Sequence, residues 1–308
     1  MLRRVLVGLA VVVLAGLVAA WFLTAPSKLP PSVLAAGYHA DLANGREVFN
    51  AGNCSACHMA PGQKDRTVLA GGVKLASPFG LFVTPNISPS KAHGIGGWTE
   101  LEFVNAMKRG VDDEGGHLYP AFPYGAYSLL KTSDVRDLYA YLKTLPAVET
   151  PSQPHQLKFP FNIRRAVGFW KLLYFHPHEY ADDPKQSAAW NRGRYLAEGP
   201  AHCAECHTAR NMLGGMDEGR LYAGAPNLEA GGRFASNITP SKDGIGDWSV
   251  EELADFLKSG TDKCFNEPDG MRNVVTSTSQ LTDADVTAIA IYIHGLPPMP
   301  GNGKHKTC

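Results

Sequence analysis

The apolar positions of this 308-residue chain predict helices joined by long loops. Two predicted helices, over about residues 134–143 and 285–294, carry apolar side chains at i, i+3, i+4 and i+7, which is the spacing of one buried helical face. These stripes consist of Val135, Leu138, Tyr139 and Leu142 in the first helix, and of Val286, Ile289, Ala290 and Ile293 in the second. The pattern therefore predicts a mainly α-helical protein.

An uncharged apolar run from Val5 to Leu23 precedes these helices. Its 19 residues are close to the minimum length for crossing a bilayer as a helix. Arg3 and Arg4 stand before it, which predicts a cytoplasmic N-terminus and an exported remainder. A cleaved signal peptide is the alternative, with Val18-Ala19-Ala20 as its cleavage site, but the apolar run continues beyond that site. We expect a retained transmembrane anchor.

The second half of the chain repeats the plan of the first about 150 residues later. The stretch Gly94-Ile95-Gly96-Gly97-Trp98 recurs as Gly244-Ile245-Gly246-Asp247-Trp248, and a capping box for a helix follows each copy. The boxes are formed by Thr99 with Glu102 and by Ser249 with Glu252, and a further stretch, Asn86-Ile87-Ser88-Pro89, recurs as Asn237-Ile238-Thr239-Pro240. Because caps, glycines and tryptophans keep one spacing, the pattern predicts a tandem duplication.

The repeat divides the chain into two domains behind the anchor of residues 1–24, and two is the number that the length favours. We expect a tether over residues 25–37, a first domain over 38–147, a linker over 148–187 and a second domain over 188–308. The linker is proline-rich at first and then unusually aromatic. Such a linker either packs across the two domains and fixes their relation, or it offers a surface to a partner or to the membrane.

Each predicted domain contains one Cys-x-x-Cys-His motif, the attachment signature of c-type haem. Two cysteines at this spacing reach the vinyl groups on one edge of a porphyrin, and the histidine that follows offers a ring nitrogen to the iron. We therefore expect two covalently bound haem c groups. The attachment residues are Cys54 and Cys57 in the first domain and Cys203 and Cys206 in the second, and the iron ligands are His58 and His207.

Two other kinds of site use closely spaced cysteines, and neither fits these motifs. A structural zinc site needs a second pair of ligands nearby, and a thioredoxin-like redox pair needs a βαβ pattern around the motif. Neither context is present in the sequence. Cys264 and Cys308 lie outside the motifs, and the sequence leaves open whether they form a disulfide or remain two thiols.

The formal net charge of the chain is zero, so the composition does not indicate a nucleic acid or an anionic surface as a partner. The sequence also lacks a glycine-rich dinucleotide fingerprint and a nucleophile elbow. We therefore expect no catalytic residue for substrate oxidation in this chain.

A c-type electron carrier commonly adds a second axial ligand to the iron, and a methionine in that place raises the potential. In the second domain Met271 follows a glycine-containing loop beyond the Trp248 helix, and we expect its thioether to ligate iron. The matching loop of the first domain has no methionine and contains Phe122, which cannot bind iron. His117 is the candidate ligand there; otherwise the first iron is five-coordinate or is ligated from elsewhere.

These motifs, together with Leu118-Tyr119-Pro120-Ala121-Phe122-Pro123-Tyr124, resemble the cytochrome c subunits of bacterial membrane-bound alcohol and aldehyde dehydrogenases. The resemblance covers about residues 44–297 and implies two tandem class I cytochrome c-like domains. Some relatives carry three haems, whereas this chain encodes two. In many relatives a methionine that ligates iron stands in the place of Phe122, so this chain departs from the family at its first haem.

The resemblance implies an electron-transfer subunit rather than an enzyme. Such subunits accept electrons from a periplasmic catalytic partner with a quinoprotein, flavin or molybdopterin centre, and pass them to quinone or to a terminal oxidase chain. They lie at the bacterial inner membrane, so we expect one N-terminal helix in lipid and both haem domains in the periplasm. The alternative function is a peroxidase-like haem enzyme or a gas sensor that uses an open coordination site on the first iron.

Overall fold

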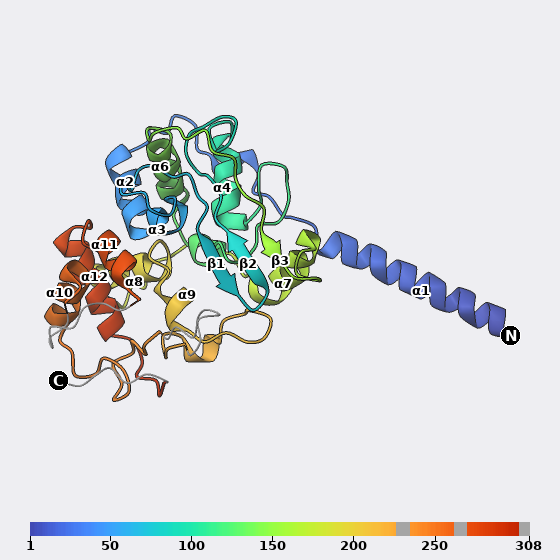
Figure 1. The fold of residues 1–308 in the computed structure, drawn as a ribbon. Coiled ribbons are helices and arrows are strands. Elements are labelled where there is room, and N and C mark those ends of the chain that lie inside the picture. The colour runs from blue at the N-terminus through green and yellow to red at the C-terminus, as the bar shows by residue number, and fades with distance from the viewer. Residues whose placement is uncertain (226–234, 262–269, 302–308) are drawn as a thin grey trace.

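The computed structural model describes residues 1–225, 235–261 and 270–301, and the described chain is mainly helical, as predicted (Figure 1). Cys264 and Cys308 lie outside the described residues. The longer helices are α1 (Leu2–Leu23), α2 (Leu42–Ala51), α4 (Glu100–Arg109), α6 (Thr132–Leu142), α7 (Val167–Tyr174), α8 (Ala188–Glu198), α10 (Val250–Ser259), α11 (Arg272–Thr278) and α12 (Asp283–His294). The shorter ones are α3 (Cys54–His58), α5 (Tyr124–Tyr127), α9 (Cys203–His207) and the 3₁₀ turns η1 (Pro31–Val33), η2 (Arg164–Ala166) and η3 (Glu218–Arg220).

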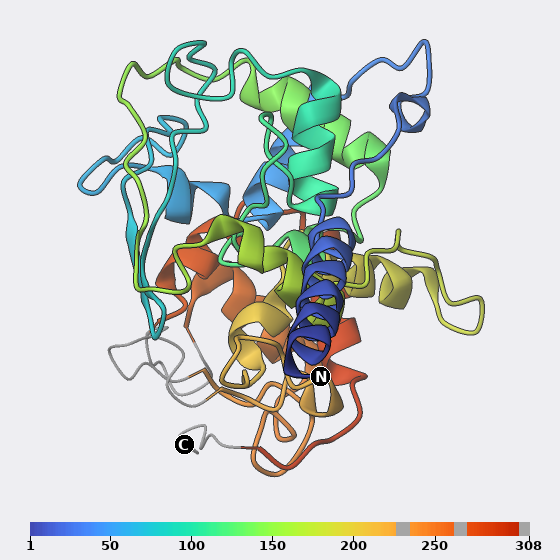
Figure 2. The same cartoon turned by 90° about the vertical axis from the view of Figure 1, so that its right-hand side faces the viewer.

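The N-terminal apolar run forms the single helix α1, which projects away from the rest of the molecule (Figures 1 and 2). None of its residues is buried, and by length and composition it is the one described helix able to cross a membrane. The segment after it, which we expect to act as a tether, contacts the first domain. Leu29, Val33 and Leu34 pack against the core of the first domain, and the Leu29 backbone N–H donates to Asn105 Oδ1 at 2.7 Å.

In each domain the first and last helices pack against each other, α2 on α6 and α8 on α12. The apolar stripes predicted for α6 and α12 lie in the cores, as expected. Helix α2 begins at Leu42, because the carboxylate of Asp41 accepts hydrogen bonds from the N–H groups of Ala43 and Asn44 and caps the helix. The core of the second domain includes Ala51 of α2, so the two cores meet.

Both predicted capping boxes are present, at the starts of α4 and α10. A left-handed glycine ends each of these helices, Gly110 with φ of 57° and Gly260 with φ of 75°. The repeated sequence stretches therefore build the same local structure twice.

The first domain also contains a small antiparallel sheet that the sequence pattern did not predict. Strand β1 (Lys74–Ser77) pairs with β2 (Gly80–Val83), which pairs with β3 (Gln156–Leu157). Leu75 lies opposite Phe82, and Gly80 lies opposite Leu157. Because β3 belongs to the linker, the linker is fastened to the first domain by backbone hydrogen bonds.

Candidate haem-binding sites

The two Cys-x-x-Cys-His motifs form two short helices of the same kind, α3 and α9. Each is preceded by a residue in the left-handed region, Asn53 with φ of 49° and His202 with φ of 39°. This shared turn sets the direction in which each short helix leaves the preceding segment. The duplication therefore extends to the backbone conformation of the attachment turns.

Each motif histidine is oriented by a backbone carbonyl. His58 Nδ1 lies 2.8 Å from the carbonyl oxygen of Pro85, and His207 Nδ1 lies 2.7 Å from that of Ser236. Burial lowers the pKa of His58, which keeps its ring neutral, so Nδ1–H donates to the carbonyl and Nε2 is the nitrogen with a lone pair. A neutral imidazole held through one nitrogen is the usual arrangement of a histidine ligand. The residues present fit haem iron at both motifs.

The repeated stretches next to the motifs hold these carbonyls in place. Asn86, directly after Pro85, donates from its side chain to the carbonyls of Val148 and Thr150. Asn237, directly after Ser236, donates in the same way to the carbonyl of Met299. Both asparagine side chains are buried, so each fixes the histidine-bonding loop to the segment that follows the last helix of its domain.

The glycine-rich stretches pack against these loops without room for a side chain. A Cβ atom on Gly94 would lie 2.1 Å from the carbonyl oxygen of Ser88, and one on Gly244 would lie 2.3 Å from that of Thr239. The sequence repeat Gly-Ile-Gly is thus explained by close backbone approach at equivalent places in both domains.

The first cysteine of each motif lies in buried surroundings. Burial raises the pKa of the Cys54 thiol to about 12 and that of Cys203 to about 12. In the part of the chain that the structure describes, no three His, Cys, Asp or Glu side chains gather as a metal cluster.

Met271 lies directly before α11, partly buried against the core of the second domain. Met271 thus belongs to the domain that holds the second motif. The role of Met271 as an iron ligand remains a prediction.

His117 lies beside the end of α1. It is buried, its Nε2 lies 2.9 Å from the carbonyl oxygen of Thr24 at the end of α1, and within the described residues its Nδ1 has no hydrogen-bond partner. Its role as a ligand of the first iron remains a prediction. Phe122 packs against the first core and shares a pocket with Glu205 of the second motif.

The two attachment turns lie next to each other at the interface between the domains, here called the seam. The ring of Tyr127 lies 5.6 Å from the ring of His202, and its hydroxyl lies 3.5 Å from the Gly52 carbonyl oxygen. Burial lowers the pKa of His202 and raises that of Tyr127, so both rings are neutral near pH 7. The seam therefore joins the two motifs through uncharged rings.

Arg66 adds a second link across the seam. Its guanidinium donates to Ser55 Oγ in α3 at 3.0 Å and to the Thr276 carbonyl in α11 at 2.6 Å, and it also donates to Ser277 Oγ. Ser277 Oγ in turn donates to the side chain of Asn53. One side chain of the first domain thus connects its own attachment helix to the second domain.

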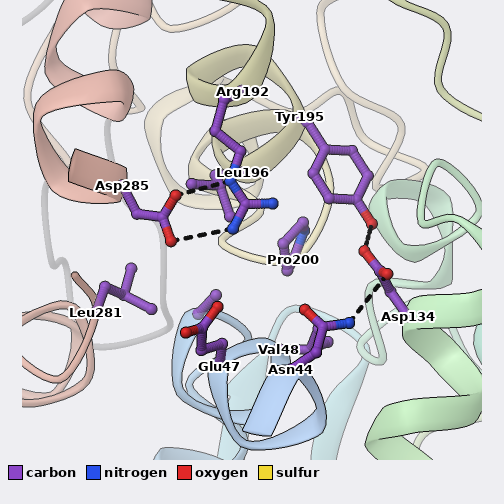
Figure 3. Close-up of a pocket in the computed structure, with 11 residues that line it drawn as sticks. Asn44, Glu47, Val48, Asp134, Arg192, Tyr195, Leu196, Pro200, Leu281 and Asp285 are labelled. Carbon is purple, nitrogen blue, oxygen red and sulfur yellow. Dashed lines mark hydrogen bonds and ion pairs between the residues drawn. The ribbon is translucent and has the colours of Figure 1, made fainter. Parts of the chain in front are cut away.

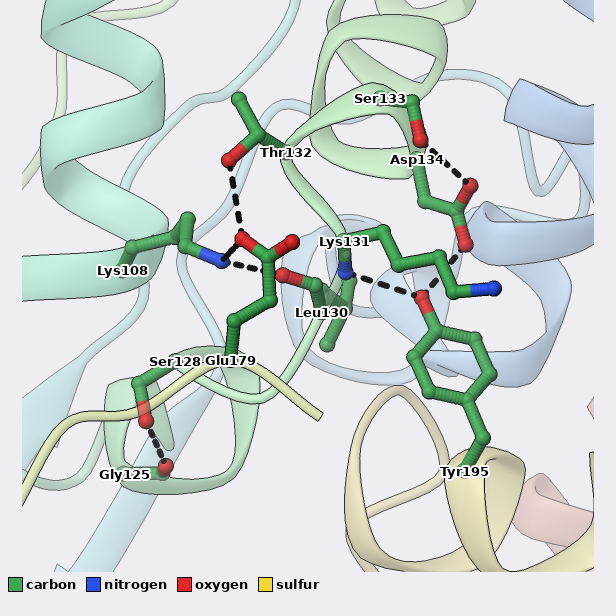
Figure 4. A network of polar contacts seen from close by, with 10 residues as sticks. All are labelled: Lys108, Gly125, Ser128, Leu130, Lys131, Thr132, Ser133, Asp134, Glu179 and Tyr195. Atoms are coloured by element: carbon green, nitrogen blue, oxygen red, sulfur yellow. Dashed lines mark hydrogen bonds and ion pairs between the residues drawn. The ribbon is translucent and has the colours of Figure 1, made fainter. Parts of the chain in front are cut away.

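Polar contacts extend the interface on its other side (Figures 3 and 4). The Tyr195 hydroxyl of α8 donates to Asp134 of α6 and accepts from the Lys131 backbone N–H at 3.2 Å. Lys108 of α4 pairs with Glu179 of the linker at 3.0 Å. Since hydrogen bonds and an ion pair join both domains and the linker, the domains form a defined interface.

Replacing Arg66 with methionine is expected to weaken this interface. The change removes three hydrogen bonds from a charged donor, and such bonds contribute about 1.5–3 kcal/mol each at most. We expect a lower melting temperature and two separate unfolding transitions, measured by calorimetry of the haem-loaded protein. Arg46→Met, at an exposed position of α2, is the control. Unchanged melting of Arg66→Met contradicts this role.

Sequence reasoning did not identify Arg66, Tyr127 or the residues that bond the motif histidines. One signal was present, because the repeated Asn-Ile-(Ser/Thr)-Pro stretch directly follows the two bonding carbonyls. No repeated stretch marks the seam residues. Arg66 and Tyr127 of the first domain contact different residues of the second domain, so the seam does not repeat in the sequence.

Comparisons with known proteins agree with this geometry. The cytochrome c family model matches residues 42–146. A "Diheme cytochrome c-type" protein of Cereibacter sphaeroides is 44% identical over 96% of this chain and 99% of that protein. The fructose dehydrogenase cytochrome subunit of Gluconobacter japonicus is 38% identical, with 88% of this chain and 55% of that protein covered. The quinone-type alcohol dehydrogenase cytochrome c subunit of Gluconacetobacter polyoxogenes is 36% identical, with 83% and 56% covered.

The chain thus spans about half the length of the two dehydrogenase subunits and nearly all of the dihaem cytochrome. With two motifs whose histidines are held alike and whose cysteines share one turn geometry, this chain belongs to the dihaem c-type cytochromes and carries two covalently bound haem c groups.

Proposed function

We propose that this chain relays electrons from a dehydrogenase to the respiratory chain, through two haem groups placed on either side of the seam. The observation that carries the proposal is that Tyr127 of α5 bridges the two attachment turns, with its ring against His202 and its hydroxyl 3.5 Å from the Gly52 carbonyl oxygen. Electron transfer between two centres falls off with the distance between them, and adjacent attachment turns favour a short one. Relatives named as cytochrome subunits of fructose and alcohol dehydrogenases support the same function.

Haem bound at each motif supplies an iron that takes up and releases one electron. The protein keeps each ligand in place during this change, because His58 and His207 are fixed through Nδ1 by backbone carbonyls. At the seam, the neutral and buried Tyr127 provides a surrounding of low polarity. We therefore expect the chain to move little when an iron takes up or releases an electron.

The dehydrogenase is proposed to lie in the periplasm, with a quinoprotein, flavin or molybdopterin centre, and quinone or a terminal oxidase chain is the proposed acceptor. Helix α1 is proposed to anchor the chain in the inner membrane, which its length and composition allow. The alternative of a peroxidase-like enzyme or gas sensor is not favoured, because the relatives are dihaem or dehydrogenase cytochromes.

Purification of the chain from membranes of its host tests the proposal. We expect a dehydrogenase subunit to copurify, and we expect its substrate to reduce both haem groups, followed by their visible absorption. A protein that turns over peroxide rapidly, with no dehydrogenase attached, contradicts the proposal.

Replacing Met271 with alanine is expected to lower the midpoint potential of one haem while both remain attached. The reason is that a thioether ligand stabilises the reduced iron, and alanine offers no ligand. Redox titration of the variant and its parent measures the change. Met212→Ala is the matched control, since Met212 is 95% exposed and should leave both potentials as they are. Two unchanged midpoints in Met271→Ala contradict the assignment.

A further inference from the structure

Helix α7 and the loop before it expose an apolar surface that the relay does not use. The surface, here called the α7 patch, contains large side chains that are 40–79% exposed: Phe159, Phe161, Ile163, Phe169, Leu172 and Leu173. Monomeric proteins seldom leave so many large apolar side chains together in water. The patch is therefore expected to have a partner.

The helix that carries the patch is apolar on two sides. On its inner side Trp170 meets the ring of Tyr124 edge-on at 6.2 Å, and Tyr174 packs against Gly215 of the second domain. On its outer side Phe169, Leu172 and Leu173 follow the i, i+3, i+4 spacing of one helical face. The inner face thus fixes α7 across both domains, as one reading of the linker expected, and the outer face remains exposed.

The position of α7 relative to α1 indicates what the outer face meets. A Cβ atom on Gly168 would lie 2.4 Å from the Thr24 carbonyl oxygen, so α7 touches the residue that follows α1. The guanidinium of Arg165 lies 4.3 Å from the ring centre of Trp21 and donates to the Trp21 carbonyl. Figures 1 and 2 both show α7 beside the inner end of α1.

A helix that crosses a bilayer places its ends at the boundary between lipid and water. Gly168 of α7 contacts Thr24, and Arg165 of the preceding turn η2 contacts Trp21, so α7 shares the depth of that boundary. Interfacial segments bury Phe and Leu side chains in this layer, and the exposed cation Lys158 beside the patch suits lipid phosphates. Arg164 nearby is already paired with Asp112 at 2.7 Å. Both the chemistry of the patch and its place fit a lipid surface.

We propose that the α7 patch lies in the interfacial layer of the periplasmic leaflet and forms a second membrane contact beside α1. This inference rests on the proposed anchoring of the chain by α1. A single helix allows the domains to rotate about its axis, whereas a second contact fixed to both domains sets their height and orientation. The seam and both attachment turns are thereby held at one distance from the membrane.

Photo-crosslinking of the full chain in its native membranes tests the inference. The photoreactive residue p-benzoylphenylalanine replaces Leu173 or Phe169 in separate variants. It replaces Leu14 of α1 as a reference for lipid contact, and Glu251, exposed on α10, as a control. We expect illumination to add the mass of one phospholipid at positions 14, 169 and 173, and none at 251.

The outcomes separate the two proposals. Lipid adducts at 14 but not at 169 and 173 overturn the second contact and leave the anchor intact. Adducts with a protein at 169 and 173 also overturn it, and identify the patch as a docking surface. Lipid adducts at none of these positions overturn the anchor as well. Reduction of the haems by a dehydrogenase substrate, followed in the same membranes, reports on the relay independently of where α7 lies.

Discussion

The double replacement Cys203→Ala with Cys206→Ala is expected to leave one covalent haem on the chain. It is also expected to abolish electron transfer from the dehydrogenase to the acceptor through this chain. The replacement Cys54→Ala with Cys57→Ala should have the same two effects. Each pair supplies the only thioether bonds of its site, and a relay of two centres fails when either is missing. The haem absorbance per chain should fall to about half, measured by haemochrome spectra.

The matched controls change the residues between the cysteines. Ala56→Ser and Ala204→Ser alter the same short helices but keep both thiols, so they should retain two haems and electron transfer. Electron transfer is measured as reduction of the acceptor by membranes supplied with the dehydrogenase substrate. A double variant that still carries two covalent haems, or that still passes electrons at the parental rate, contradicts the two-site relay.

Replacing Gly45 or Gly193 with alanine is expected to destabilise one domain strongly. These glycines occupy equivalent places, Gly45 in α2 facing α6 and Gly193 in α8 facing α12. A Cβ atom on Gly45 would lie 2.2 Å from the Asp137 carbonyl oxygen, and one on Gly193 would lie 1.8 Å from that of Ala288. Overpacking lowers the free energy of unfolding by about 1–3 kcal/mol and sometimes more. Because the added Cβ atoms would clash with backbone, which cannot move aside easily, we expect losses at the upper end of this range.

For domains of this size a loss of about 3 kcal/mol lowers the melting temperature by roughly 10–20 °C. Melting is followed by far-UV circular dichroism and by the visible band of the haem in the affected domain. Gly97→Ala is the control, since its Cβ atom would meet only the Lys91 carbonyl oxygen at 3.7 Å, which is ordinary contact. Melting of Gly45→Ala and Gly193→Ala at the parental temperature contradicts the close helix pairing.

The sequence predicted those parts of the fold that depend on local chemistry. The capping boxes at Thr99 and Ser249 set the starts of α4 and α10, and the stripe of Val286, Ile289 and Ile293 marked the buried face of α12. A capping residue and a helical face are both determined within a few residues of the chain, so their signals are readable in one short stretch.

Contacts between distant segments were not readable in the same way. Arg66 meets Thr276, 210 residues further along, and no local pattern marks such a pair. Strand β3 has two residues, too few for an alternating pattern to be recognised. His117 contacts Thr24, which precedes it by 93 residues, and no local pattern marked that contact either.

The intact mass of the mature chain tests most directly whether both motifs bind haem. We expect the mass of the polypeptide, with residues 1–24 retained, plus two covalently bound haem groups. A mass with one added haem, or with none, contradicts the claim that both Cys-x-x-Cys-His motifs hold a redox centre.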